Sequence, residues 1–320
     1  MSSIVETRGL TRRFTVREGM HRRKLTAVDD LSISVDEGEA VGYIGANGAG
    51  KSTTIKMLVG ILVPSSGEVT TCGLHPIKDR SNLSRRVGVV FGQRSQLWWD
   101  LPLKDSFSLL AAIHGLQAAR AKARTDELVE RLEMGEQLGT PVRQLSLGQR
   151  MRGEIAAALL HQPSLVILDE PTIGLDVLSK QRLREFLIAE RRAHGTTLLL
   201  TTHDMGDVER LCDRILLVDR GRLAFDGTLA GLSQQVGAGR VLVVDFHQPT
   251  PDLVDIPDTS LLGSESSGLR QRLSFDPSVT TAARVLAAVA ERAEVLDLTV
   301  EEPDVEDVVR RVYAAQREGT

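Results

Sequence analysis

The chain has 320 residues, of which 42% are hydrophobic, 26% charged and 3% aromatic. This length exceeds one ordinary domain, so we expect a large domain and a smaller one. The scarcity of aromatic side chains and the net charge of −4 argue against a nucleic-acid partner. No apolar run approaches the roughly 18 residues that cross a bilayer. The two cysteines, Cys72 and Cys212, suit neither a metal pair nor a disulfide framework, so we expect a soluble chain in a reducing, cytosolic compartment.

Over roughly the first 230 residues, short apolar runs alternate with longer helical stretches. This alternation is typical of a mostly parallel α/β sheet. The predicted strands are Ala40–Ile44, Arg86–Phe91, Leu165–Leu168 and Thr197–Thr201, and a hairpin joins Leu216–Val218 to Leu223–Phe225. The predicted helices are Ser52–Leu62, Leu103–Leu116, Lys122–Leu132 and Met151–Leu160.

Charge is concentrated in two parts of the sequence. Between Arg8 and Lys24, seven residues are Lys or Arg and one is Glu. We expect a solvated loop there, although contact with phosphates or anionic lipid is the alternative. From Ala238 to Thr320 the chain carries 15 acidic and 8 basic residues.

The composition changes near Ser233–Arg240, where the stretch from Gly231 to Arg240 carries three glycines and no strong periodicity. We therefore predict a first domain over residues 1–232 and a second over residues 238–320. The second domain is expected to be α+β and to stabilise a dimer, with ligand sensing as the alternative. Its predicted strands are Val241–Phe246, Leu269–Phe275 and Val295–Val300, and its predicted helices are Ala282–Arg292 and Val305–Ala315.

A phosphate-binding loop is predicted directly after the strand Ala40–Ile44. The residues from Gly45 to Ser52 fit the spacing G-x-x-x-x-G-K-S, between a strand and a helix. Such glycines let backbone N–H groups converge on phosphate oxygens at a helix N-terminus, while Lys51 supplies a charge and Ser52 a hydroxyl for Mg²⁺. The predicted binding residues are Gly45, Asn47, Gly48, Ala49, Gly50, Lys51, Ser52 and Thr53.

Two further strands end in polar residues. The strand Leu165–Leu168 runs into Asp169 and Glu170, whose side chains point to opposite sides and can take different roles. We predict that Asp169 orients the Mg²⁺ shell and that Glu170 polarises the attacking water; alone, such a pair is usually a helix cap or a solvated edge. His203 follows Thr197–Thr201 and is either a surface residue or part of the same site.

The segment Leu145–Gln149, with the sequence LSLGQ, opens a second helix whose N-terminus can bind an anion. A simple helix start capped by Ser146 is the alternative. Here the sequence resembles the ATP-binding subunits of ABC transporters, whose signature motif usually has Gly where this chain has Leu147. The resemblance implies an α/β P-loop ATPase core with a mostly parallel sheet, an antiparallel β portion and a helical insertion at about 94–163, followed by the α+β domain.

The same resemblance assigns further residues. Residues 173–176, ending in Asp176, look like the D-loop, His203 like the switch histidine, Gln93 like the Q-loop glutamine, and Phe14 like the aromatic that stacks on adenine. It implies ATP and Mg²⁺ as ligands, the metal held by Ser52, Gln93 and Asp169. It also implies a head-to-tail dimer, homomeric or heteromeric, in which each ATP lies between one subunit's phosphate loop and the other's Ser146, Gly148 and Gln149.

The segment from Val90 to Pro102 resembles the ATPases of ABC-2-type exporters, including viologen exporters, and so does the EEP-x-x-EDV segment from Glu301. Because Gly92 separates the aromatic from Gln93, Gln96 is the alternative glutamine. Trp98 and Trp99 are predicted to form a socket for a partner helix, with packing inside the insertion as the alternative. The likeness implies export through a separate ABC-2-type permease at the cytoplasmic face of the membrane; the rival functions are a non-transport ABC ATPase and a decayed interaction module.

Overall fold

The computed structural model describes residues 2–18, 21–92, 95–235, 239–277 and 279–301, together with residue 308. The chain divides into two compact units, Met1–Gly227 and Thr228–Thr320. The boundary between the two units lies before helix α8 (Leu229–Gln235), whereas the sequence prediction ended the first domain at residue 232. Across the described ranges, no helix combines the length and the apolar character needed to span a membrane.

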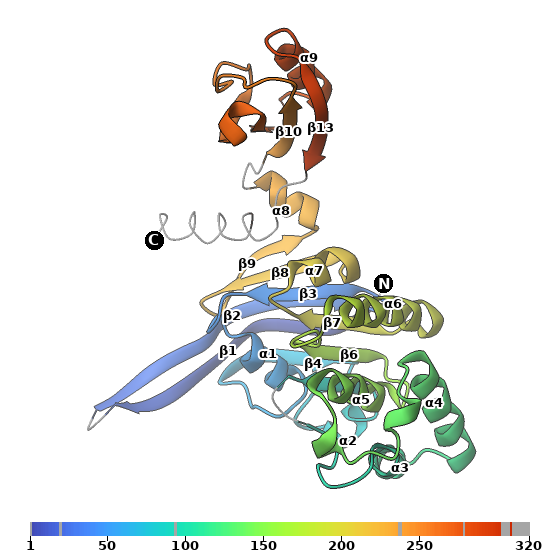
Figure 1. The fold of residues 1–320 in the computed structure, drawn as a ribbon. Helices are drawn as coiled ribbons and strands as arrows, with labels where there is room; N and C mark the ends of the chain where they lie inside the picture. The colour runs from blue at the N-terminus through green and yellow to red at the C-terminus, as the bar shows by residue number, and fades with distance from the viewer. Residues whose placement is uncertain are drawn as a thin grey trace. The chain divides into compact units, whose positions relative to one another are not determined.

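A six-stranded sheet lies in the first unit (Figure 1), with the strand order β5-β6-β7-β3-β8-β9. Neighbouring strands are parallel except β8 and β9, which form the predicted hairpin. The mostly parallel sheet expected from the sequence is therefore confirmed. Its strands are β3 (Ala40–Gly45), β5 (Val87–Phe91), β6 (Leu165–Asp169), β7 (Thr197–Thr201), β8 (Arg214–Asp219) and β9 (Arg222–Gly227).

Both faces of this sheet are buried, which explains the uninterrupted apolar sequence of its strands. In β6, Leu165 and Ile167 pack into one core, whereas Val166 and Leu168 pack into the other. The first core includes helix α1 (Lys51–Leu58) and the antiparallel sheet, and the second includes the helices that follow β5. The sheet is thus clamped between two layers, and its strand ends are held in fixed positions.

The antiparallel portion is a three-stranded sheet with the order β2-β1-β4. Its strands are β1 (Ser3–Glu18), β2 (His21–Asp36) and β4 (Ser66–Thr71). The loop expected between Arg8 and Lys24 is wrong, because residues 8–18 and 21–24 lie in β1 and β2, which pair as a long hairpin. Pairing with β4 ends at Thr11, and beyond it the two-stranded ribbon projects from the unit (Figure 1). Both faces of such a ribbon meet water, so its sequence lacks an alternating pattern.

The helical insertion follows β5 and contains α3 (Leu103–Ile113), α4 (Ala118–Arg131), the short helices η1 (Gly135–Gln137) and η2 (Val142–Gln144), and α5 (Leu147–Leu159). The other helices of the unit are α2 (Arg80–Leu83), α6 (Val177–His194) and α7 (Met205–Leu211). The insertion has an apolar interior in which Leu103, Phe107 and Leu128 are buried against α5.

The second unit contains a four-stranded antiparallel sheet with the order β11-β12-β10-β13 and the helix α9 (Ala282–Ala290). Its strands are β10 (Arg240–Phe246), β11 (Thr259–Glu265), β12 (Arg270–Phe275) and β13 (Val295–Glu301), and η3 (Ser266–Gly268) lies between β11 and β12. The α+β class is confirmed, but β11 was not predicted. The predicted closing helix Val305–Ala315 lies outside the described residues apart from Val308.

The two cysteines are free thiols in the first unit. Burial raises the pKa of the Cys72 thiol to about 11. Burial, together with the nearby Asp213 and Asp207 carboxylates, raises the pKa of the Cys212 thiol to about 12. Both side chains are therefore neutral thiols at physiological pH.

Candidate functional site

The loops that follow four parallel strands converge on one cleft, with a volume of about 590 Å³. Carboxyl ends of parallel strands share one edge of a sheet, which is where open α/β sheets bind ligands. The structure brings most of the predicted residues together there: the cleft is lined by Asn47, Gly48, Ala49, Gly50, Lys51, Ser52, Thr53, Asp169, Glu170 and His203. This set combines one ammonium group, two carboxylates, one imidazole and a helix N-terminus.

The phosphate-binding loop fits tightly between its neighbours. Gly50 has a φ of 100°, and a Cβ atom there would lie 2.3 Å from the carbonyl oxygen of Ala27. A Cβ atom at Gly45 would lie 2.5 Å from the carbonyl oxygen of Val218. Only glycine fits both positions. Gly50 also begins α1 without a side-chain cap, so the first N–H groups of this helix have no capping side chain.

Lys51 is the buried cation of the cleft. Its Nζ donates to the carbonyl oxygens of Gly45 at 2.6 Å and Ala46 at 3.2 Å, so the side chain folds back over its own loop. Burial lowers the pKa of Lys51, while the Glu170 and Asp169 carboxylates oppose that shift. A phosphate anion would compensate the positive charge of Lys51 more fully than the two carbonyl dipoles do.

Asp169 and Glu170 lie side by side but face different partners. Asp169 Oδ1 accepts a hydrogen bond from the Thr201 hydroxyl at the end of the neighbouring strand β7. Glu170 Oε1 lies 3.3 Å from Nε2 of His203, and Glu170 Oε2 accepts from the backbone N–H of His203 at 3.3 Å. The carboxylate of Glu170 and the imidazole of His203 are therefore held against each other at the edge of the cleft.

Glu170 has an unusual backbone conformation. Its φ is 57°, in the left-handed region that non-glycine residues rarely adopt. Its N–H donates to the carbonyl oxygen of Thr201 at 2.9 Å, which holds the turn in place. Such a conformation costs on the order of 1–3 kcal/mol and persists where the surroundings enforce it, often at functional sites.

The signature segment lies outside this cleft. The Ser146 hydroxyl accepts from the N–H of Gln149 at 3.2 Å, and the Gln149 side-chain oxygen accepts from the N–H of Ser146 at 2.9 Å. These two bonds form a complete capping box at the start of α5. Ser146 is exposed, so the N-terminus of α5 faces solvent.

Leu147, where the signature motif usually has glycine, lies against Gly174 in the segment predicted to be the D-loop of the same chain. A Cβ atom at Gly174 would lie 2.2 Å from Cδ2 of Leu147, and one at Gly148 would lie 2.9 Å from Cδ2 of Leu175. The signature turn and the D-loop therefore interlock. Asp176 caps α6, because its carboxylate accepts from the N–H of Ser179 at 2.9 Å, and these Ser179 bonds lower the pKa of Asp176.

Phe14 and Gln96, both singled out in the sequence, do not line the cleft, and neither does Gly45. Phe14 pairs with Leu25 on the hairpin, and its ring lies 4.7 Å from the Arg12 guanidinium. Gln93 lies outside the described residues. The alternative, Gln96, donates to the carbonyl oxygen of Glu154 at 3.0 Å and so faces α5 rather than the cleft.

Four cleft residues were missed in the sequence: Ala27, Lys56, Phe91 and Gly92, whereas Ile173 begins the segment predicted as the D-loop. Phe91 ends the predicted strand Arg86–Phe91 and Gly92 directly follows it, and this position at a strand end was the available signal. Lys56 lies on α1 about one turn after Ser52 and adds a second cation. Ala27 comes from the hairpin, and nothing in its sequence context indicates proximity to the phosphate loop.

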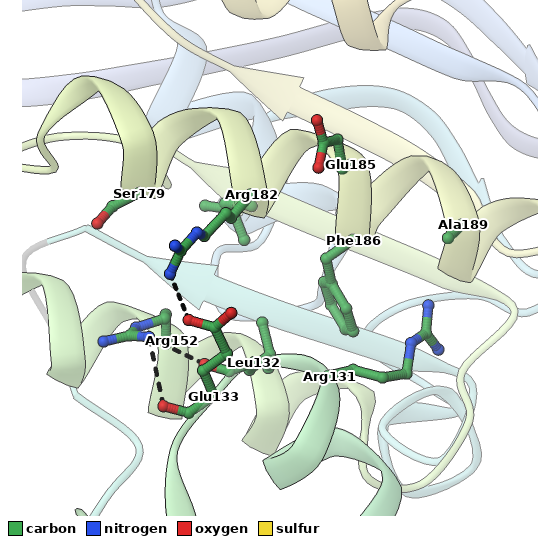
Figure 2. Close-up of a pocket in the computed structure, with 10 residues that line it drawn as sticks. Arg131, Leu132, Glu133, Arg152, Ser179, Arg182, Glu185, Phe186 and Ala189 are labelled. Carbon is green, nitrogen blue, oxygen red and sulfur yellow. Dashed lines mark hydrogen bonds and ion pairs between the residues drawn. The ribbon is translucent and has the colours of Figure 1, made fainter.

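A second cavity, of about 450 Å³, lies between the insertion and α6 (Figure 2). Arg131, Arg152 and Arg182 line it, but each already has a protein partner. Arg182 pairs with Glu133, Arg152 donates to the carbonyl oxygen of Leu132 at 3.0 Å, and Arg131 lies 4.7 Å from the Phe186 ring centroid. This cavity therefore offers an anion less than the cleft does.

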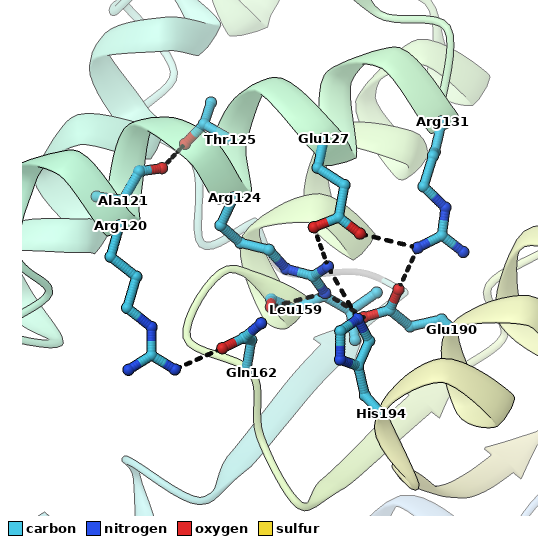
Figure 3. A network of polar contacts seen from close by, with 10 residues as sticks. All are labelled: Arg120, Ala121, Arg124, Thr125, Glu127, Arg131, Leu159, Gln162, Glu190 and His194. Atoms are coloured by element: carbon cyan, nitrogen blue, oxygen red, sulfur yellow. Dashed lines mark hydrogen bonds and ion pairs between the residues drawn. The ribbon is translucent and has the colours of Figure 1, made fainter.

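Next to this cavity, a buried polar network joins α4 to α6 (Figure 3). Glu190 accepts from Arg124 and, at 2.6 Å, from Arg131, while Glu127 accepts from the same two guanidinium groups. Glu127, Glu190 and His194 are close enough to share a metal ion. However, the two arginines already neutralise both carboxylates and would repel a cation. We interpret this network as an anchor of the insertion.

A mostly parallel sheet that brings a phosphate loop, an Asp-Glu pair and a histidine to one edge defines a P-loop ATPase. Known proteins agree with this class. The sequence profile of the family described as ABC transporter matches residues 28–173. A Nod factor export ATP-binding protein I from Paraburkholderia xenovorans (strain LB400) is 37% identical over 232 residues, which cover 71% of this chain and 73% of the relative.

A second relative matches more of the chain. The linearmycin resistance ATP-binding protein LnrL of Bacillus subtilis (strain 168) is 31% identical over 291 residues, or 88% of this chain and 92% of the relative. A solved structure, an ATP binding subunit of an ABC transporter, is similar with a TM-score of 0.66 and 29% identity, covering 73% of this chain and 94% of that one. The chain belongs to the ABC transporter ATP-binding family and is an ABC-type ATPase.

Proposed function

We propose that two subunits, identical or different, bind two ATP molecules with Mg²⁺ head to tail and power export through a separate ABC-2-type permease at the cytoplasmic face of the membrane. The observation that carries this proposal is the convergence of Lys51, Ser52, Asp169, Glu170 and His203 on one cleft. The names of two relatives, for Nod factor export and linearmycin resistance, support an exporter.

In this proposal the cleft binds the triphosphate of ATP. The N–H groups at the start of α1 and the Nζ of Lys51 bind the β- and γ-phosphates, and Lys56 adds positive charge nearby. The hydroxyl of Ser52 and a carboxylate oxygen of Asp169 are hard oxygen donors that fit Mg²⁺. Bound Mg²⁺ would neutralise charge on the phosphates during transfer.

Glu170 and His203 supply the groups for hydrolysis. A carboxylate at this position accepts a proton from the attacking water. The contact with His203 at 3.3 Å restricts the rotation of the Glu170 side chain and keeps its oxygens at the cleft edge. His203 in turn is available to donate a hydrogen bond to the γ-phosphate.

The exposed signature turn supports a shared site. Ser146 and Gly148 do not line the cleft of their own chain, although the N-terminus of α5 suits an anion. In a head-to-tail dimer this turn closes the cleft of the partner subunit. Each ATP then needs residues from both chains.

The tryptophan pair is the proposed contact with the permease. Trp98 is 38% exposed and Trp99 is 50% exposed, so part of each side chain is available to a partner. The guanidinium of Arg150 lies 5.5 Å from the Trp99 ring centroid and links this surface to α5. Large exposed aromatic side chains are typical anchors of protein interfaces.

Glu170→Gln tests the site. The amide cannot accept the proton, so we expect ATP hydrolysis to fall on the order of 10²–10⁴-fold. ATP binding should persist because Lys51 and Ser52 are unchanged. With MgATP, the variant should therefore elute as a dimer in gel filtration, and without nucleotide as the apo subunit does.

Glu209→Gln is the matched control, because Glu209 is an exposed acid on α7 that does not line the cleft. It should hydrolyse ATP at the wild-type rate. Wild-type hydrolysis by Glu170→Gln, with no dimer in MgATP, would contradict both the role of Glu170 and the shared site.

A further inference from the structure

The carboxylate of Asp207 is a fully buried charge that the proposed reaction does not use. It lies in α7, does not line the cleft and has no exposed surface. It accepts hydrogen bonds from the Thr172 hydroxyl at 2.5 Å, the Thr202 hydroxyl at 3.0 Å and Nε of Arg184 at 2.6 Å. Burying a carboxylate is costly unless charge and donors compensate it, and here three donors do.

Two of these donors come from the loops that carry the reacting groups. Thr172 follows Glu170 by two residues, and Thr202 directly precedes His203. The Asp207 carboxylate therefore joins the loop after β6 to the loop after β7. The Glu170 side chain also contacts His203, and the Glu170 N–H donates to the carbonyl oxygen of Thr201, but among the described residues only the Asp207 carboxylate ties both loops to a buried charge.

The third donor ties the same junction to α6. Nε of Arg184 donates to the Asp207 carboxylate. One turn earlier on α6, Nζ of Lys180 donates to the carboxylate of Asp204 at 2.5 Å, and Asp204 directly follows His203. α6 begins at the D-loop, where Asp176 caps it. The two loops are thus fixed to each other and to a long helix.

We propose that Asp207 is a positioning residue for ATP hydrolysis, which holds the loops of Glu170 and His203 in register through Thr172 and Thr202. The proposal rests on the roles proposed for Glu170 and His203. It does not involve the phosphate loop, which lies on β3 and α1. Loosening the junction should therefore lower kcat and leave the KM for ATP unchanged.

Thr172→Val tests this role. Valine keeps the shape of threonine and removes the hydroxyl that bonds to Asp207. Because small displacements of reacting groups have large effects on rate, we expect kcat to fall at least about tenfold, with the KM within about twofold of wild type. Thr172→Ser keeps the hydroxyl and should restore most of kcat.

Thr71→Val is the matched control. The Thr71 hydroxyl is buried and donates to the carbonyl oxygen of Leu58 at 2.8 Å, far in sequence from both loops. It should lower the melting temperature as Thr172→Val does, but leave kcat unchanged. Arg184→Lys is a second variant in case Thr172→Val does not fold. It keeps the charge but loses the Nε donor, so it should also lower kcat without changing the KM for ATP.

Wild-type kcat in Thr172→Val and Arg184→Lys would overturn the proposal, and so would an equal loss of kcat in Thr71→Val. Glu170→Gln measured in parallel separates failure of the proposed function from failure of the role of Asp207. If it is inactive while Thr172→Val is normal, the proposed function stands and the role of Asp207 fails. If Glu170→Gln hydrolyses ATP normally, the role assigned to Glu170 fails first.

Discussion

Helices α1 and α5 both begin at turns that suit an anion, but they satisfy their first N–H groups in opposite ways. α1 begins at Gly50, which has no side chain to cap the helix. α5 begins at Ser146, and its capping box with Gln149 is complete. The first N-terminus is open to a ligand, whereas the second is already satisfied by its own chain.

Because of this difference, we expect α1 to bind a phosphate by itself and α5 to contact a phosphate that another subunit already holds. A phosphate at α1 replaces no side-chain cap, and Lys51 only has to turn away from two carbonyl oxygens. A phosphate at α5 competes with a cap that is worth about 1 kcal/mol. We infer that a single subunit can bind ATP at α1, and that α5 engages only a nucleotide already held by the partner.

The largest expected effect comes from substitutions at the N-terminus of α1 and, separately, at the N-terminus of α5. Lys51→Ala should abolish ATP binding by the isolated subunit. Gly148→Asp should leave binding intact but abolish hydrolysis, because its carboxylate would meet the partner's γ-phosphate in a partly dry interface. ATP binding measured by calorimetry and phosphate release measured on the same variants separate these outcomes.

Gly148→Ala is the control for size without charge, and it should retain more activity than Gly148→Asp. Mixing Lys51→Ala with Gly148→Asp should restore about a quarter of the wild-type rate, because half of randomly formed dimers are mixed and each has one intact site. Normal hydrolysis by Gly148→Asp alone would mean that α5 closes no site.

A smaller effect is expected from the tryptophan surface, which is attached to α5 through Arg150 and not to α1. The double change Trp98→Ala with Trp99→Ala should leave the basal ATPase of the isolated subunit near wild type. It should weaken assembly with the permease by about 2 kcal/mol or more, roughly 30-fold in affinity, as for a buried aromatic anchor. A pull-down with the permease and a melting curve of the same variant measure both.

Val254→Ala is a matched truncation, because Val254 is 65% exposed and lies in the second unit. It should not change permease binding. If the tryptophan variant is destabilised yet binds the permease as tightly as wild type, the surface is not the docking site.

The smallest effect concerns the opposite end of α5. His161 follows this helix and stacks on His114, which ends α3, with ring centroids 3.9 Å apart. Burial and the neighbouring His114 lower the pKa of His161 to about 4, from an ordinary value of 6.5. The unfolded chain therefore takes up a proton below pH 6.5 that the folded chain takes up only near pH 4, so stability is complete above pH 6.5 and falls as the pH is lowered.

At pH 5.5 this should reduce the free energy of unfolding by about 1 kcal/mol relative to pH 7.5. Urea titrations followed by the fluorescence of Trp98 and Trp99, both close to α3, would measure the change in the insertion. His161→Gln should remove most of the pH dependence, whereas His75→Gln, at an exposed position, should retain it. An identical pH profile in wild type and His161→Gln would rule out His161 as the source of the pH dependence of stability.

Much of the fold and site was predictable because local sequence determines it. Uninterrupted apolar runs such as Leu165–Leu168 arise only where both faces of a strand are buried, and the phosphate loop requires glycines at fixed spacing. The far part of the hairpin of β1 and β2, beyond Thr11, was missed because solvent lies on both of its faces. β11 was missed because its exposed and half-buried residues do not resemble a core strand.

The role of Asp207 depends on contacts that the sequence does not encode locally. Asp207 and Glu209 are two acids on the same short helix, and their spacing alone does not tell which one is buried. Only the packing of α7 against α6 and two strand ends brings Asp207 between Thr172 and Thr202. Positions fixed by packing of distant segments are those that one sequence leaves open.

The unreactive cysteines give the subunit a practical advantage for spectroscopy. Maleimide dyes react with thiolates, and the raised pKa values of Cys72 and Cys212, about 11 and about 12, leave almost none at neutral pH. A cysteine introduced at Val177, which is 80% exposed beside the D-loop, would therefore take a single label without removal of the native cysteines. A fluorophore there would report the approach of a second subunit in real time.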